Sequence, residues 1–111
     1  MLVERKEVLN EDGSVGYIEA IFDSDNILKT TYFHQAQRLY IAFNRGGTYS
    51  YENVSPDMYQ QFENAESQGK FFHQNIRNNS KYPYRKEFTL YPTEIAEAKQ
   101  IIEENKIEED E

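Results

Sequence analysis

The chain has 111 residues and a net charge of −8, and nine tyrosines and seven phenylalanines supply much of its 38% hydrophobic content. A chain of this length has room for one modest core, so we expect a single domain in which aromatic rings provide much of the burial. There is no cysteine, only two histidines and no apolar run as long as a membrane span, which argues against disulfides and metal clusters and leads us to expect a soluble cytoplasmic protein.

The first segment of the chain, residues 1–23, is predicted to form a β-hairpin. Apolar residues lie among charges in residues 3–9, turn-forming residues follow at 10–14, and residues 16–22 are again largely apolar. Gly13 is the residue expected to adopt a positive φ. An isolated hairpin is only marginally stable in water, so we expect this one to extend the sheet that follows.

Two further strands are predicted at residues 27–33 and 38–44. In the second of these, Leu39, Ile41 and Phe43 occupy alternate positions and therefore fall on one face of the sheet. A glycine pair, Gly46 and Gly47, then closes a hairpin onto residues 48–54.

The length of this glycine loop decides which face carries Tyr49 and Tyr51, because a one-residue slip reverses every side chain. A three-residue loop places Asn44 opposite Thr48 and both tyrosines on the face of Phe43, whereas a two-residue loop exposes them on the other face. We favour the first register because it gathers the polar residues of this strand on the outer face: Thr48, Ser50 and Glu52. In that register the tyrosines are buried or half-buried in the core. In the other register they are exposed and could stack on unpaired bases.

Helices are predicted after this hairpin. Ser55 is suited to cap a helix that begins at Pro56, and this helix is expected to break near Glu66. Its inward stripe consists of Met58, Tyr59, Phe62 and Ala65. A second short helix is expected within residues 70–78, with Phe72 and Ile76 inward and Arg77 outward.

The rest of the chain is predicted to form an edge strand and a last helix. Pro83 favours an extended conformation around residues 82–91. From Pro92 onward a helix carries a narrow apolar stripe and is expected to fray beyond Asn105. The stripe consists of Ile95, Ala98 and Ile102.

Together these elements predict an α+β fold, in which a small antiparallel meander sheet packs against two or three short helices in a single domain. We divide the chain into an acidic hairpin extension (residues 1–23), a core module (residues 24–86) and a C-terminal strand and helix with an acidic tail (residues 87–111). The charges follow this division. The first segment carries −4, the core module +3 and the last segment −7.

A series of short motifs runs through the core module in a fixed order: Asn26-Ile27, Leu39-x-Ile41-x-Phe43, Gly46-Gly47, Tyr49-x-Tyr51, Asn53-Val54-x-Pro56, Ala65-x-Ser67-x-Gly69-Lys70-Phe71-Phe72 and Ile76-Arg77. This order resembles the KTSC domain, a small module found at the C-terminus of some lysyl-tRNA synthetases and as a stand-alone protein in bacteria and phages. The resemblance implies a small α+β module with a central Tyr-x-Tyr and a role in RNA binding. The chain departs from the family pattern in Ser55, which stands where the family runs Val-Pro directly, and in its acidic extensions.

The core module interleaves basic and aromatic residues, which is the combination that a groove for single-stranded nucleic acid requires. We therefore predict a non-enzymatic module that binds RNA or another nucleic acid. The expected contact residues are Arg45, Tyr49, Tyr51, Arg77, Lys81, Tyr84, Arg85 and Lys86, with Tyr40 as a further stacking candidate. Solvated surface bases and core tyrosines would account for the same residues without any ligand.

No catalytic residues, metal site or cofactor site are predicted. The Arg45-Gly46-Gly47 segment lacks the Lys-Ser/Thr pair of a phosphate-binding loop and is interpreted as a turn. For His34 and His73, neither a nucleophile nor an orienting group can be assigned from spacing. We therefore expect no enzymatic activity.

Two alternative functions remain open at this stage. The acidic flanks carry −11 together, which is compatible with a protein-interaction or inhibitor module, such as a bacterial or phage accessory factor that binds a basic partner. The acidic residues near the C-terminus, Glu103, Glu104 and residues 108–111, could bind such a partner, but we favour a solubilising role for them. A third possibility is a small nucleotide-like ligand in a pocket lined by tyrosine and arginine, for instance at the interface of a homo-oligomer.

Overall fold

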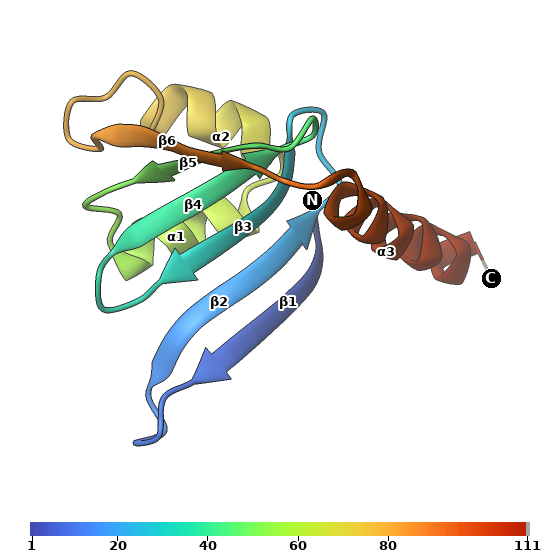
Figure 1. The fold of residues 1–111 in the computed structure, drawn as a ribbon, viewed down its shortest axis with the longest axis horizontal. Coiled ribbons are helices and arrows are strands. Elements are labelled where there is room, and N and C mark those ends of the chain that lie inside the picture. Colours follow the sequence, from blue (N-terminus) through green and yellow to red (C-terminus); the bar gives the residue numbers. More distant parts are fainter. Residues whose placement is uncertain (111) are drawn as a thin grey trace.

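The computed structural model describes residues 1–110, with side chains described as far as Lys106. Within this part of the chain, one six-stranded antiparallel sheet with the strand order of the sequence is flanked by three helices (Figure 1). The strands are β1 (Leu2–Leu9), β2 (Val15–Phe22), β3 (Ile27–Phe33), β4 (Arg38–Phe43), β5 (Gly47–Tyr51) and β6 (Tyr84–Thr89). The helices are α1 (Pro56–Asn64), α2 (Gln68–Asn75) and α3 (Pro92–Asp110). The predicted α+β meander is confirmed.

The hairpin of β1 and β2 extends the sheet as predicted. β2 pairs with β3, with Ala20 opposite Thr30, and the hairpin turn projects away from the rest of the molecule (Figure 1). Gly13 in this turn has a φ of 89°. A residue with a Cβ would be strained in this backbone conformation. The N-terminal end of β1 lies near α3 (Figure 1).

The register of β4 and β5 places both tyrosines on the predicted face, although the predicted pairing was wrong by two residues. Ile41 lies opposite Tyr49 and Ala42 lies opposite Thr48, so Tyr49 and Tyr51 share the face of Ile41. The prediction of an exposed polar face was also wrong, because Thr48 and Ser50 are only 2% and 3% exposed.

The reason for this burial lies in β6 and the segment after it. Phe88 lies opposite Thr48 in the sheet, and Leu90 packs on the same side of the sheet. The two hydroxyls are nevertheless satisfied, since Thr48 donates to the carbonyl of Gly46 and Ser50 donates to Glu87.

The main core lies between the sheet and the helices α1 and α2. Ser55 caps α1 by accepting a hydrogen bond from the amide of Met58, as predicted. Tyr59 and Phe62 of α1 and Phe72 of α2 are buried against the strands. The rings of Tyr32 and Tyr59 stack with their centroids 4.5 Å apart. Aromatic rings therefore provide much of this core, as the composition predicts.

α3 packs on the opposite face of the sheet over β1, β2 and β3. The predicted stripe is confirmed, because Ala98 and Ile102 are buried against Leu28 and Ile95 is partly buried beside them. The helix continues to Asp110 and is longer than predicted. The acidic side chains predicted to form the tail, residues 108–111, lie outside the described side chains.

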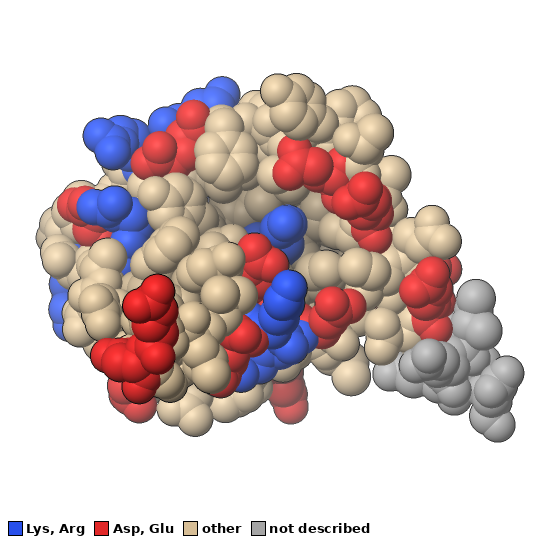
Figure 2. Space-filling model, turned by 60° about the horizontal axis from the view of Figure 1, so that its bottom comes forward, with Lys and Arg blue, Asp and Glu red and all other residues tan. Residues whose placement is uncertain are grey.

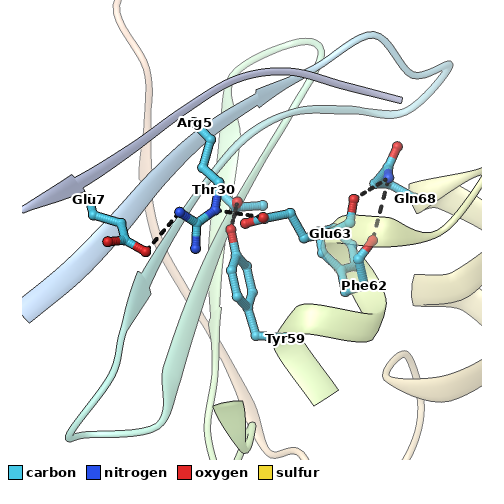
Figure 3. Close-up of polar contacts among 7 residues, drawn as sticks. All are labelled: Arg5, Glu7, Thr30, Tyr59, Phe62, Glu63 and Gln68. Carbon is cyan, nitrogen blue, oxygen red and sulfur yellow. Dashed lines mark hydrogen bonds and ion pairs between the residues drawn. The ribbon is translucent and has the colours of Figure 1, made fainter. Parts of the chain in front are cut away.

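A polar network joins β1 to α1 beneath the N-terminal hairpin (Figure 3). Nε of Arg5 donates to Oε1 of Glu63 at 2.6 Å, and the Glu63 side chain is only 9% exposed. Close by, the hydroxyl of Tyr59 lies 3.3 Å from Oγ1 of Thr30, and burial raises the pKa of Tyr59 above its ordinary value. The same network continues to Gln68, whose amide donates to backbone carbonyls at the end of α1. The hairpin is thus attached to the core by a partly buried ion pair as well as by the sheet.

Among the described residues, no helix is both long and apolar enough to cross a membrane.

Candidate functional site

A hollow of about 740 Å³ opens at the end of the helix-covered face, between strands β4 to β6 and helix α2. We call it the aromatic hollow. Its aromatic lining consists of Phe43, Tyr49, Tyr51, Phe72 and Tyr84. Its polar lining consists of Asp25, Asn26, Asn44, Arg45, His73, Arg77 and Asn78, with Gly69 between them.

The aromatic residues form one continuous set of ring contacts. Tyr51 lies 5.3 Å from Phe72 and 6.1 Å from Tyr84 between ring centroids, and Tyr49 lies 6.2 Å from Tyr84. Tyr51 is only 6% exposed, and its burial raises its pKa to about 12, whereas Tyr84 is 65% exposed. The hollow therefore has a buried aromatic floor and an exposed aromatic ring at its edge.

Arg45 reaches the hollow from the tight turn between β4 and β5. The amide of Gly46 donates to the carbonyl of Phe43 at 2.8 Å, and the carbonyl of Gly46 accepts from the amide of Leu90 at 2.8 Å. Gly46 has a φ of 98°, and a Cβ at this position would lie 2.9 Å from Cδ1 of Ile95. The turn that carries Arg45 is therefore held from two sides and requires glycine.

Arg77 reaches the same hollow from the end of α2. Its guanidinium nitrogen Nη1 lies 3.2 Å from Nδ1 of His73, within hydrogen-bond distance. The backbone amide of Arg77 donates to the carbonyl of Phe72, which fixes the end of the helix. Both side chains are exposed and face the aromatic floor from one wall.

Another part of the wall is the loop between β2 and β3, which adjoins α2 at Gly69. The amide nitrogen Nδ2 of Asn44 donates to the carbonyls of Ser24 at 3.0 Å and of Asp25 at 2.7 Å, and the backbone amide of Asn44 donates to the carbonyl of Asn26. These bonds fix the position of the loop. Its polar side chains are therefore presented to the hollow from a rigid backbone.

Five of the eight predicted contact residues line the aromatic hollow, although they come from separate segments of the chain. They are Arg45, Tyr49, Tyr51, Arg77 and Tyr84. The remaining three, Lys81, Arg85 and Lys86, do not line it. Lys86 pairs with Tyr49 across β5 and β6 and lies on the same face, exposed beside the hollow.

Arg85 and Lys81 are placed elsewhere. Arg85 lies opposite Ser50, on the other face of the sheet, and pairs with Glu87 at 3.3 Å. A hydrogen bond from Ser50, together with Arg85, lowers the pKa of Glu87. Lys81 lies 5.6 Å from the ring of Tyr82 in the loop before β6. Tyr40, the further stacking candidate, also faces away from the hollow and lines a groove on the other side of the sheet.

Sequence reasoning missed several polar residues of the hollow, notably Asp25, His73 and Asn78. A signal existed for His73, which precedes Arg77 by four residues and therefore shares its helix face. No comparable signal exists for Asp25, which reaches the hollow only because its loop is bound to Asn44.

The lining of the hollow determines which chemical groups it can offer. Its side chains supply aromatic faces, hydrogen-bond donors and two guanidinium groups. Among the described residues, no group of three or more His, Asp or Glu side chains is arranged to hold a metal ion.

Comparison with known proteins identifies the family of the chain. The family model of the KTSC domain matches residues 23–82, which is more than half of the chain. The chain belongs to the KTSC domain family. The predicted resemblance is thereby confirmed, and the match contains every residue of the aromatic hollow except Tyr84. The N-terminal hairpin, β6 and α3 of this KTSC protein lie outside the matched range.

The crystal structure of a KTSC domain protein from Yersinia pestis is similar to this KTSC protein. The two chains are 33% identical and superpose with a TM-score of 0.58, over 63% of this chain and 96% of the other. A search of curated proteins finds no match.

Proposed function

We propose that this KTSC protein is a non-enzymatic module that binds single-stranded RNA, or another single-stranded nucleic acid, in the aromatic hollow. The observation that supports this function best is the convergence of three tyrosines and two arginines, from β5, β6, the β4–β5 turn and the end of α2, in one concave site. Convergence of this kind distinguishes a binding site from basic residues scattered on a surface.

The roles of the residues follow from their exposure. Tyr84 offers the exposed ring on which a base stacks, and Tyr49 and the buried Tyr51 supply the apolar floor beneath it. Stacking on an aromatic side chain contributes about 1–3 kcal/mol per base and does not depend strongly on sequence. In this proposal, Arg45 and Arg77 bind the phosphates that flank the base. The hollow has the size of a typical small-ligand site, which fits one nucleotide of a strand.

Binding is expected to be weak and to depend only modestly on salt, because few positive charges are involved. On the face drawn in Figure 2, basic side chains lie among acidic ones, and acidic side chains predominate toward α3. Two phosphate contacts predict a slope of about −1.4 for the logarithm of the association constant against the logarithm of salt concentration.

The experiment is a binding titration by fluorescence anisotropy, with a labelled single-stranded RNA, from about 50 to 200 mM salt. Arg77→Gln should reduce the magnitude of the slope by about 0.7, because one phosphate contact is lost. Lys99→Gln removes the same charge from the exposed surface of α3 and should leave the slope unchanged. Tyr84→Ala should weaken binding by about tenfold or more at every salt concentration.

Circular dichroism of each variant establishes that the fold is retained. A protein that binds no RNA at about 50 mM salt, or binds it with no dependence on salt, contradicts the proposed function. That result would direct attention to a protein ligand for the acidic flanks instead.

A further inference from the structure

A second pocket of about 280 Å³ lies beside the aromatic hollow, along α2. The two concavities share four lining residues, namely Asp25, Asn26, Gly69 and His73. Because they share these residues, the two concavities adjoin, and we call the pair the trough; Tyr84 lines only its first part and Lys70 only its second. Together they offer more room than the aromatic hollow alone.

The chemistry of the two parts differs. The second pocket is lined by hydroxyl and amide side chains, including Ser67 and Gln74, together with the ammonium of Lys70 and the edge of His73. Apart from that shared imidazole it offers no ring on which a base can stack, among the described residues. Hydroxyls, amides and an ammonium are instead the groups that bind sugar and phosphate oxygens.

The charges alternate along the trough. Arg45 and Arg77 lie in the aromatic hollow, Asp25 lies at the junction, and Lys70 lies in the second pocket. Asp25 is the acid common to both pockets, and its loop is fixed by the bonds from Asn44. A carboxylate accepts hydrogen bonds and repels phosphate, so the group beside Asp25 must be a donor that carries no negative charge. In a nucleic acid strand, the sugar lies between two phosphates and carries such a donor only in RNA, as the 2′-hydroxyl.

We propose that the trough binds a strand of RNA across more than one nucleotide, with phosphates at Arg77 and Lys70 and the intervening 2′-hydroxyl donating to Asp25. This inference rests on the proposed function, to which it adds the path of the strand and a residue that selects RNA over DNA. Asp25 acts as a specificity residue, and Lys70 extends the phosphate contacts beyond the hollow.

The test compares single-stranded RNA and DNA of the same adenine and cytosine sequence, together with a nucleoside monophosphate. The native protein should bind the RNA about tenfold more tightly than the DNA. A difference of this size is what one hydrogen bond to a charged acceptor contributes to affinity. Asp25→Ala should abolish this preference and should tighten the binding of DNA, because it removes a charge that repels phosphate. The control Glu97→Ala removes an equal charge from the exposed side of α3 and should leave the preference unchanged.

Lys70→Gln tests whether the site binds a strand rather than a single nucleotide. With Lys70 as a third phosphate contact the native slope for the RNA becomes about −2.1, and the substitution should reduce its magnitude by about 0.7. The affinity for the nucleoside monophosphate should not change. Lys99→Gln again serves as the control of equal charge.

The outcomes distinguish this inference from the function on which it rests. The inference is wrong if RNA and DNA bind equally well, if Asp25→Ala does not alter the ratio of their affinities, and if Lys70→Gln does not alter the salt slope. In that case the proposed function still stands, provided that Arg77→Gln weakens the binding of both nucleic acids. If neither nucleic acid binds, both are wrong.

Discussion

The two ends of the helix-covered face carry the same types of residue. At one end these side chains bond to other residues of the chain, and at the other end several of them are exposed. At the closed end, beneath the N-terminal hairpin, Arg5 binds the buried Glu63 at 2.6 Å and Tyr59 contacts Thr30 (Figure 3). At the open end, which is the aromatic hollow, Arg45 has no ion-pair partner among the described residues and Tyr84 is largely exposed. Tyrosine and arginine content therefore does not mark a binding site by itself. What distinguishes the open end is that the guanidinium of Arg45 and the ring of Tyr84 are exposed and accessible to a ligand.

The largest expected difference between the two ends concerns the removal of an aromatic ring. Phe62→Ala at the closed end should lower the free energy of unfolding by about 3–5 kcal/mol, because Phe62 is completely buried. Tyr84→Ala at the open end should lower it by less than about 0.5 kcal/mol, because most of that ring already faces solvent. Urea unfolding of both variants measures this. Equal losses would show that the two ends do not differ.

Gly46→Ala tests whether the backbone of the open end is rigid although several of its side chains are exposed. The substitution should cost about 2 kcal/mol of unfolding free energy, since Gly46 has a positive φ and a Cβ would approach Ile95. Gly47→Ala is the matched control, because a Cβ there would meet only the ring of Tyr49 at 4.0 Å. Thermal unfolding distinguishes the two variants. A Gly46→Ala protein as stable as Gly47→Ala would mean that the turn adapts.

Arg5→Gln tests the closed end. The carboxylate of Glu63 would lose its cationic partner while it remains buried, which should cost about 1–3 kcal/mol. Lys6→Gln in the same strand removes an equal charge from an exposed position and should have an effect within about 0.5 kcal/mol. The comparison is made by urea unfolding at constant pH. If both substitutions have the same small effect, the contact between Arg5 and Glu63 contributes little to stability.

Alkaline pH should destabilise the folded protein, because the buried tyrosines of this face resist ionisation. Burial raises the pKa of Tyr32 and Tyr51 to about 12 from an ordinary value of 10.0. The unfolded chain therefore binds fewer protons than the native protein at pH values between 10 and 12, and the unfolding free energy falls as pH rises through this range.

Denaturant unfolding measured across this pH range tests the prediction. Tyr51→Phe should remove part of the dependence on pH, because it removes one ionisable hydroxyl. Stability that stays constant up to pH 12 would contradict the assigned burial.

Local sequence patterns predicted most of the fold. Alternation in β4, the cap at Ser55 and the stripe of α3 each depend on neighbouring residues, and the structure confirms all three. The exposed polar face of β5 was predicted wrongly because its burial depends on Phe88 and Leu90, which follow much later in the chain.

The aromatic hollow was predictable only in part, for a related reason. Residue type identified Arg45, Arg77 and the tyrosines, but their convergence depends on how α2 packs beside β5 and β6. Arg85 met the same criteria of residue type, and the bulge in β6 beside Tyr49 sets it in a register that places it on the other face. Asp25 belongs to the site through hydrogen bonds to its loop, which no local pattern encodes.

The most direct test of the central claim is an amide NMR titration of the whole chain with single-stranded RNA. The account predicts that the chemical-shift changes are concentrated in the β4–β5 turn, at the end of α2 and around Tyr84, with the closed end around Arg5 and Glu63 unaffected. Changes concentrated in α3 or in the N-terminal hairpin, or no changes at all, would contradict it.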